Sequence, residues 1–168
     1  QVAEVKNGNG RVYPRGILER EMKNYQKLID ERRAVGELDH PDSSVVELKN
    51  CSHLITEVWW DGNNVMGKLE VLNTPAGQTL RALASCGVGI GISSRGMGSV
   101  YERNGVTMVE DDYNLICFDV VSDPSAPGAF MKPMGNMPSR KNMTMSVGLK
   151  ETNTSDKLHL LMNEILRK

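Results

Sequence analysis

Apolar residues recur at helical spacing near the start of the chain, from residue 17 onwards. The apolar positions there are Leu18, Met22, Tyr25 and Ile29. Because they lie three or four residues apart and charged residues fill the opposite face, the pattern predicts an amphipathic helix over residues 17–33. A second, shorter helix is predicted after Pro75 and is expected to stop at Gly87.

Strand patterns dominate the middle of the chain. Segments rich in β-branched and aromatic residues predict strands at 52–60, 64–72 and 113–121, with a hairpin at 98–110. Asn104-Gly105, at the centre of that hairpin, is the strongest short-range hairpin signal. Residues 34–44 contain turn-forming residues and are predicted to form a loop. Helices among mostly antiparallel strands indicate an α+β fold.

The end of the chain differs from the rest in composition. Residues 131–154 combine five methionines with prolines, glycines and a basic pair, which predicts an irregular linker. Ser155 suits the N-cap of a helix, and residues 155–168 are predicted to form an amphipathic one.

Composition and charge narrow the classes of function. The 168 residues, 39% hydrophobic and 24% charged, are typical of one soluble globular domain. The net charge of -1 argues against binding to nucleic acid or to an anionic membrane surface. No apolar run approaches the roughly 20 residues that span a bilayer. The start at Gln1, without Met and without a secretory signal, leads us to expect further residues upstream.

Cofactor chemistry has no support in the sequence. Cys51, Cys86 and Cys117 are widely spaced and form no Cys-x-x-Cys pair. Neither a zinc site nor a disulfide framework is therefore predicted, and we expect no metal and no other cofactor.

Residues 87–99, GVGIGISSRGMGS, form an unusual glycine-rich segment with three serines and one arginine. A dinucleotide-binding fingerprint would need a glycine where Ile92 stands, and no Lys-Ser or Lys-Thr pair follows for a P-loop. The hydrolase pattern Gly-x-Ser-x-Gly also fails, because Arg95 takes the place of the last glycine. A close-packed strand explains the glycines but not the two hydroxyls and the arginine at its polar end.

A serine nucleophile needs a base, and the chain offers three histidines. His159 lies in the predicted C-terminal helix, and His53 lies in a predicted strand, facing either the core or the surface. His40 lies in a turn between Asp39 and Pro41, and loops often carry functional residues. Since Pro41 restricts the backbone of His40 to extended values, the direction of the imidazole would be held.

Five segments occur in an order and spacing that resemble the prohead core proteases of T-even-type tailed phages. They are NGRVYPRGILE, GELDHP, VWWDGNNVMGKLEVL, GISSRGMGS and DPSAP. The resemblance covers roughly residues 5–130. The family is related to the herpesvirus assembly proteases, which implies a mostly antiparallel β-barrel flanked by helices, herpesvirus-assemblin-like, with residues 1–130 as the protease domain.

The resemblance also implies a serine protease whose nucleophile lies on a barrel strand and whose base is a histidine earlier in the chain. Ser93 matches the nucleophile and His40 matches the base. Ser94 is the competing candidate. Because neighbouring residues of a strand point to opposite faces, only one of the two serines can meet the base.

The third catalytic residue is expected to be an acid on a later strand, and Asp119 in CFDVV fits. A carboxylate inside an apolar run is costly unless it is paired. The alternative interpretation is a strand-end carboxylate that backbone donors satisfy. Asp39 and Asp111 are further alternatives, although neither interrupts an apolar strand.

Residues after the nucleophile are expected to bind the substrate. We assign Arg95, Gly96 and Ser94 to the oxyanion and substrate-binding site, since an amide or a guanidinium there would stabilise a tetrahedral intermediate. A surface salt bridge is the alternative for Arg95. Gly96 and Gly98 would allow close approach of a substrate backbone.

As a whole, the resemblance implies an endopeptidase that cuts scaffold, core and major capsid proteins after glutamate. It would act as a homo-oligomer inside the prohead, in the bacterial cytoplasm, with no nucleic-acid or membrane partner. The motif Leu or Ile, any residue, Glu recurs at residues 149–151, in the predicted linker, so self-cleavage after Glu151 is expected. A non-catalytic barrel protein of the phage head or tail tube is one alternative. A cysteine hydrolase using Cys86 or Cys117 is another.

Overall fold

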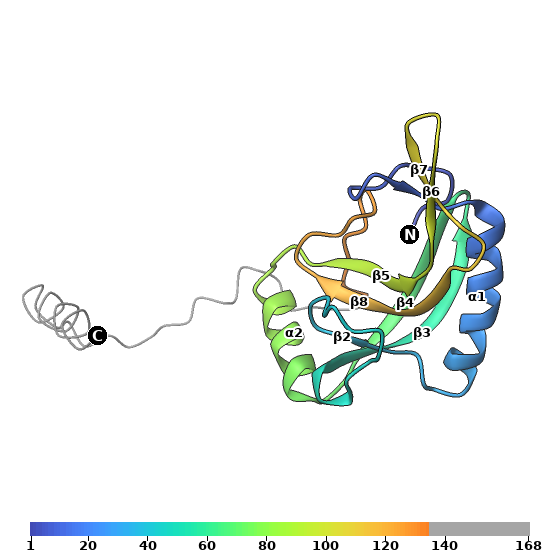
Figure 1. Ribbon diagram of the computed structural model, residues 1–168. Helices are drawn as coiled ribbons and strands as arrows, with labels where there is room; N and C mark the ends of the chain where they lie inside the picture. Colours follow the sequence, from blue (N-terminus) through green and yellow to red (C-terminus); the bar gives the residue numbers. More distant parts are fainter. Residues whose placement is uncertain (135–168) are drawn as a thin grey trace, which may run out of the picture. The chain divides into compact units, whose positions relative to one another are not determined.

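The computed structural model describes residues 1–134 of the chain (Figure 1). The elements in chain order are β1 (Arg11–Val12), α1 (Arg15–Asp30), β2 (Val35–Glu37), the short 3-10 helix η1 (Leu48–Asn50), β3 (Cys51–Asp61), β4 (Asn64–Val71), α2 (Pro75–Ser85), β5 (Gly91–Met97), β6 (Val100–Arg103), β7 (Val106–Val109) and β8 (Asn114–Val121). The predicted helix at 155–168 and most of the predicted linker at 131–154 lie outside the described residues. Both stay predictions.

Helix α1 confirms the amphipathic pattern at the start of the chain. Its buried residues include Ile17, Leu18, Met22, Tyr25 and Ile29. The helix ends at Asp30 rather than at residue 33. Arg32 adopts a left-handed backbone conformation (φ 53°), and the Arg33 amide donates to the Leu28 carbonyl, so the chain turns back before the predicted end.

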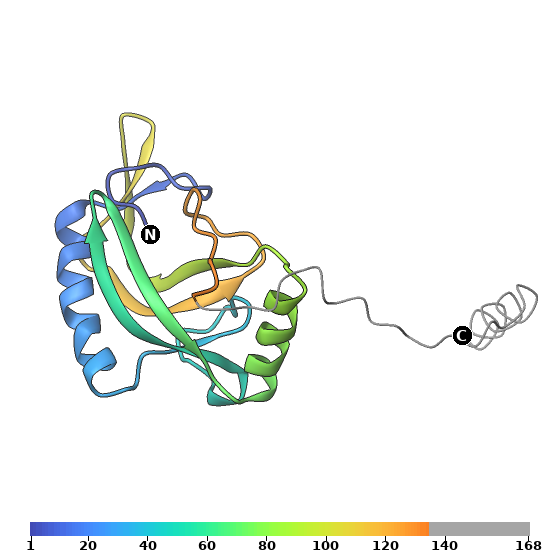
Figure 2. The same ribbon diagram turned by 180° about the vertical axis from the view of Figure 1, so that it is seen from behind.

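The predicted hairpins are confirmed. β3 and β4 pair in antiparallel fashion, as do β6 and β7. The turn between β6 and β7 has positive φ at both Asn104 and Gly105, as a two-residue hairpin turn requires. This second hairpin projects from the rest of the molecule in Figures 1 and 2.

The prediction of an uninterrupted loop over residues 34–44 is wrong in its first part. Val35–Glu37 form strand β2, which pairs with β3. A Cβ atom at Gly36 would overlap the Phe118 carbonyl oxygen and the His53 imidazole, so only glycine fits there. The glycine that looked like a loop residue therefore permits close packing of β2 against β8.

The expected closed barrel is not found among residues 1–134. The strands form three sheets, with the orders β2-β3-β4, β1-β7-β6 and β5-β8. Only a single bridge, between Leu38 and Val120, continues β2 onto β8. No continuous ladder joins these three sheets, so the coarser α+β prediction holds and the barrel does not.

The two helices lie on opposite sides of the strands (Figures 1 and 2). Helix α1 packs against β3 and β8, and α2 packs against β3 and β4. The larger apolar cluster surrounds α1 and includes Phe118 of β8. A smaller cluster joins Leu80 of α2 with Ile90 and Val120. Strand β8 thus contributes to both clusters and is held firmly from two sides.

His53 lies in the core and is fully buried. Its Nε2 atom donates to the Phe118 carbonyl at 3.0 Å, and its Nδ1 atom accepts from the Ser52 hydroxyl at 2.9 Å. These partners select the neutral imidazole that carries its proton on Nε2. Burial lowers the pKa of His53 from its usual value, because the charged form would lose its hydration.

This burial predicts a pH dependence of stability. Above the unfolded-state pKa, near 6.5, His53 is neutral in both states and its full contribution is present. As the pH falls below that value, the unfolded chain binds the proton first, which costs up to about 1.4 kcal/mol per pH unit. We expect His53→Gln to remove this loss in urea unfolding measured from about pH 7 to pH 5. Equal slopes for the variant and the wild type would contradict the prediction.

Candidate active site

Ser93 and Asp119 lie directly opposite each other in the antiparallel pair β5–β8. Opposite residues of such a pair share one face of the sheet, with Cβ atoms about 5 Å apart. Asp119 is fully buried and Ser93 partly buried. Ser94 is paired with Phe118 and points to the other face. The register therefore brings Ser93, and not Ser94, to the carboxylate.

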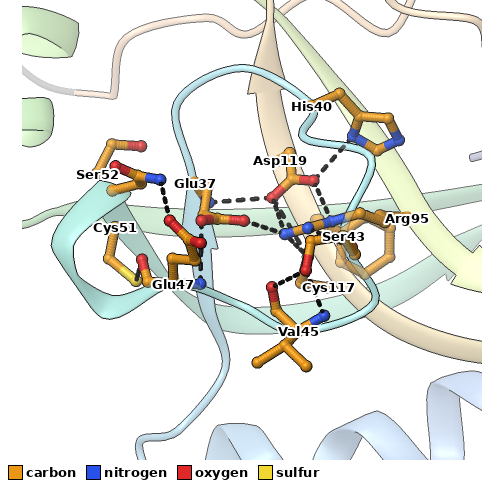
Figure 3. Close-up of polar contacts among 12 residues, drawn as sticks. Glu37, His40, Ser43, Val45, Glu47, Cys51, Ser52, Arg95, Cys117 and Asp119 are labelled. Atoms are coloured by element: carbon orange, nitrogen blue, oxygen red, sulfur yellow. Dashed lines mark hydrogen bonds and ion pairs between the residues drawn. The ribbon is translucent and has the colours of Figure 1, made fainter.

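His40 meets the same carboxylate. Its Nδ1 atom lies 2.8 Å from Oδ2 of Asp119, and its side chain is 40% exposed (Figure 3). The backbone holds it there, because the Asp39 amide donates to the Val120 carbonyl at 2.8 Å. Within residues 1–134 the Nε2 atom of His40 has no hydrogen-bond partner. One ring nitrogen is thus fixed while the other is available to a reacting group.

Arg95 has a different place from the one predicted. It is 5% exposed, so the alternative of a surface salt bridge is wrong. Its Nε and Nη2 atoms approach the two oxygens of Asp119 at 2.9 and 3.3 Å, and Nη2 also pairs with Glu37 (Figure 3). Its Nη1 atom donates to the Ser43 carbonyl at 2.7 Å. Nη1 and Nη2 are thus occupied by hydrogen bonds, whereas Nε lies close to Asp119 without forming a hydrogen bond.

Opposing effects act on the pKa of Arg95. Burial alone would lower its pKa, but its contacts with Cys117, Asp119 and Glu37 raise the pKa above the usual value. The guanidinium is therefore a permanent positive charge beneath Asp119.

Glu37 is a site residue that the sequence reasoning missed. It is fully buried, its Oε1 accepts from the Glu47 amide at 3.0 Å, and its own amide donates to Oδ1 of Asp119 at 3.0 Å. One signal was present in the sequence. Arg95 stands alone in an otherwise uncharged strand, and a buried arginine needs acidic partners.

Ser94 and the following glycines contact the start of the chain and Tyr113. The Ser94 hydroxyl donates to Oε1 of Gln1 at 2.7 Å. A Cβ at Gly96 would overlap the Tyr113 ring, and one at Gly98 would overlap the Tyr113 backbone. Packing of Tyr113 therefore gives a structural reason for both glycines, and the expected approach of a substrate backbone stays a prediction.

The other candidate residues lie in unsuitable surroundings. Burial, and next the charge of Asp119, raise the pKa of Cys117 to about 12, so its thiol is not a nucleophile at neutral pH. Cys86 is exposed at the end of α2 and does not border the hollow that His40 and Ser93 line. Asp111 pairs with Arg20.

The residues brought together line one hollow of the surface. It is bordered by His40, Ser93, Ser94, Arg95 and Gly96, together with Asn9, Arg11, Tyr13, Val121, Asp123 and Ser125. Of the described residues, no three His, Cys, Asp or Glu side chains are grouped to hold a metal ion. No helix of residues 1–134 is long and apolar enough to cross a membrane.

Comparison with known proteins identifies the family of this chain. A family model described as prohead core protein serine protease matches residues 1–141. The chain belongs to this family. The family expected from the sequence motifs is thereby confirmed, and the site described above lies in a member of the prohead core protease family.

Two comparisons, one of sequence and one of structure, both match phage T4 and support the assignment. The prohead core protein protease of Enterobacteria phage T4 is 33% identical over 171 residues, covering 99% of this chain and 77% of that protein. The solved structure of the bacteriophage T4 capsid assembly protease is 34% identical with a TM-score of 0.69, covering 72% of this chain and 76% of that one. The α+β fold is thus shared with a known prohead protease.

The two faces of β5 predict different effects for two adjacent substitutions. We expect Ser93→Ala to lower peptide cleavage by roughly a thousandfold or more, because the hydroxyl beside Asp119 is lost. Ser94→Ala, its matched control, should keep activity within roughly tenfold, because that hydroxyl faces Gln1. Thermal unfolding would confirm that both variants fold. Exchanged results would identify Ser94 as the nucleophile.

Proposed function

We propose that this chain is the serine endopeptidase that matures a phage prohead, with Ser93 as nucleophile, His40 as general base and Asp119 as the acid that orients the base. The proposal rests on the hydrogen bond between His40 and Asp119, since Asp119 lies directly opposite Ser93 in the sheet. The membership of the chain in the prohead core protease family supports it. Its substrates are the core, scaffold and capsid proteins inside the prohead.

The proposed reaction uses the free nitrogen of His40. The Ser93 oxygen attacks the scissile carbonyl, and Nε2 of His40 takes the hydroxyl proton. Nδ1–H meanwhile donates to Asp119, which selects the tautomer and stabilises the imidazolium. The same Nε2 then gives the proton to the leaving amine. Water repeats the sequence on the acyl-enzyme, so the serine is restored.

The Arg95 side chain binds Ser43, Glu37 and Asp119 through Nη1 and Nη2, so the proposal assigns the oxyanion to other donors. We assign this role to backbone amides at Arg95 and Gly96, the residues that follow Ser94 on β5. Such a donor contributes about 3 to 4 kcal/mol to transition-state stabilisation.

The substrate is proposed to lie as an extended segment along the edge of β5 that faces the hollow. Among residues 1–134, the ladder of β5 is complete on the β8 side only, and residues 129–131 cover its start on the other. Unpaired strand edges bind extended peptides through main-chain hydrogen bonds. Cleavage after glutamate, assembly as a homo-oligomer and the relation to the herpesvirus proteases belong to this proposal through the family resemblance alone.

A serine-reactive fluorophosphonate tests the proposal directly. We expect labelling of the wild type at Ser93, and a loss of roughly a thousandfold or more in peptide cleavage for His40→Ala. The double variant His40→Ala/Ser93→Ala should be hardly worse than either single variant, because the residues act as one unit. Additive losses would argue against a shared site. An unlabelled, inactive wild type would favour a non-catalytic structural protein.

Self-cleavage after Glu151 is a separate prediction. Residues 149–151, Leu-Lys-Glu, lie outside the described residues. The same motif at 17–19 and 55–57 falls in α1 and β3, where regular structure protects it from cleavage, and at 29–31 it lies at the end of α1. Intact-mass measurement should find a product ending at Glu151 for the wild type and not for Ser93→Ala. A wild type that digests scaffold protein and stays full length would overturn the prediction.

A further inference from the structure

Three charged side chains are buried together beneath the hollow, and two of them are negative. Glu37 and Asp119 are fully buried, and Arg95 is 5% exposed (Figure 3). Arg95 contacts both carboxylates, so one positive charge is shared between two negative ones. With these ionised the cluster has a net charge of one negative unit.

A surplus charge of this kind has to be compensated, because burying an unpaired ion is costly. Part of the compensation comes from the main chain, since the Glu47 amide donates to Glu37 and the Glu37 amide donates to Asp119. The remaining partner is His40, whose Nδ1 contacts Asp119. In the proposed mechanism the imidazole gains a positive charge when it takes the serine proton.

We propose that Glu37 is a positioning residue that supplies this surplus negative charge and thereby stabilises the imidazolium of His40. Arg95 alone would cancel the charge of Asp119. With Glu37 also bound to Arg95, the cluster and the protonated His40 sum to zero. Glu37 acts through Arg95 and Asp119, and the inference depends on the proposed roles of Ser93 and His40.

Other groups also face His40. They are Cys117 and Asp119 of β8, Arg95 of β5, Glu37 of β2, the neighbouring Asp39, and Arg11 and Asp123 of the hollow. Asp39, Arg11 and Asp123 are exposed, so water and salt screen their charges. The Cys117 thiol is neutral because burial raises its pKa to about 12. Among these groups, Glu37 is thus the one buried charge that remains besides the ion pair of Asp119 and Arg95.

The test compares substitutions at Glu37 by the rate of fluorophosphonate labelling as a function of pH. In this reaction the Ser93 oxygen bonds to phosphorus, fluoride leaves and His40 takes the proton. The acid limb is the part of the profile in which the labelling rate rises with pH, up to a plateau. We expect Glu37→Gln to move this limb to lower pH by about one unit, roughly the effect of one buried charge. The labelling rate at the plateau should fall several-fold. Glu37→Asp keeps the charge and should keep the position of the limb even if the rate falls.

Glu21→Gln is the matched control. Glu21 is also a buried carboxylate, bound to the Arg20 guanidinium and to the Leu115 amide of β8, but it does not contact the cluster. Its loss should lower stability and leave the acid limb in place. If the acid limb is unchanged in Glu37→Gln while labelling of the wild type depends on Ser93, the inference about Glu37 is overturned and the proposed function stands. Labelling that does not depend on Ser93 would instead overturn the proposed function.

A second measurement applies if Glu37→Gln does not fold. Carboxyl-13C NMR of the wild type, assigned with Glu37→Asp, reports the charge of Glu37 and Asp119 directly. The proposal requires both carboxyls to be ionised throughout the pH range of labelling. A carboxyl of either residue that is protonated in that range would overturn it.

Discussion

The ion pair between Arg95 and Asp119 is the interaction on which the site depends. Asp119 has no contact with water, and a buried carboxylate stays charged only among donors and positive charge. Arg95 supplies both, and its third nitrogen binds the Ser43 carbonyl, which fixes the loop after His40. The same guanidinium therefore contacts the buried Asp119 carboxylate and holds the loop that follows His40.

The helices, the hairpins and the α+β class could be predicted because they depend on local patterns. The spacing of Leu18, Met22 and Tyr25 specifies a helix whatever it packs against, and Asn104-Gly105 specifies a hairpin turn. Strand β2 was missed because three residues around Gly36 carry no periodicity. Its glycine is explained only by Phe118 and His53, which lie far away in the sequence.

Local patterns also predict some residues of the candidate site and not others. Alternation along β5 separates Ser93 from Ser94, and an isolated acid in an apolar strand draws attention to Asp119. The surroundings of Arg95 could not be predicted, because burial of a charged residue depends on partners that other segments bring. Glu37 and the Ser43 carbonyl come from β2 and from the loop after it, and nothing local in β5 indicates them.

The site also has a consequence for timing during synthesis. The hydrogen bond between His40 and Asp119 joins residues 79 positions apart, and the one between Glu37 and Asp119 joins residues 82 apart. Contacts of such long range form late, after most of the chain has emerged and collapsed. A nascent or truncated chain that lacks β8 has neither Asp119 nor the Val120 carbonyl that holds the backbone beside His40. The arrangement of His40, Ser93 and Asp119 therefore forms only once β8 has been made and has paired with β5.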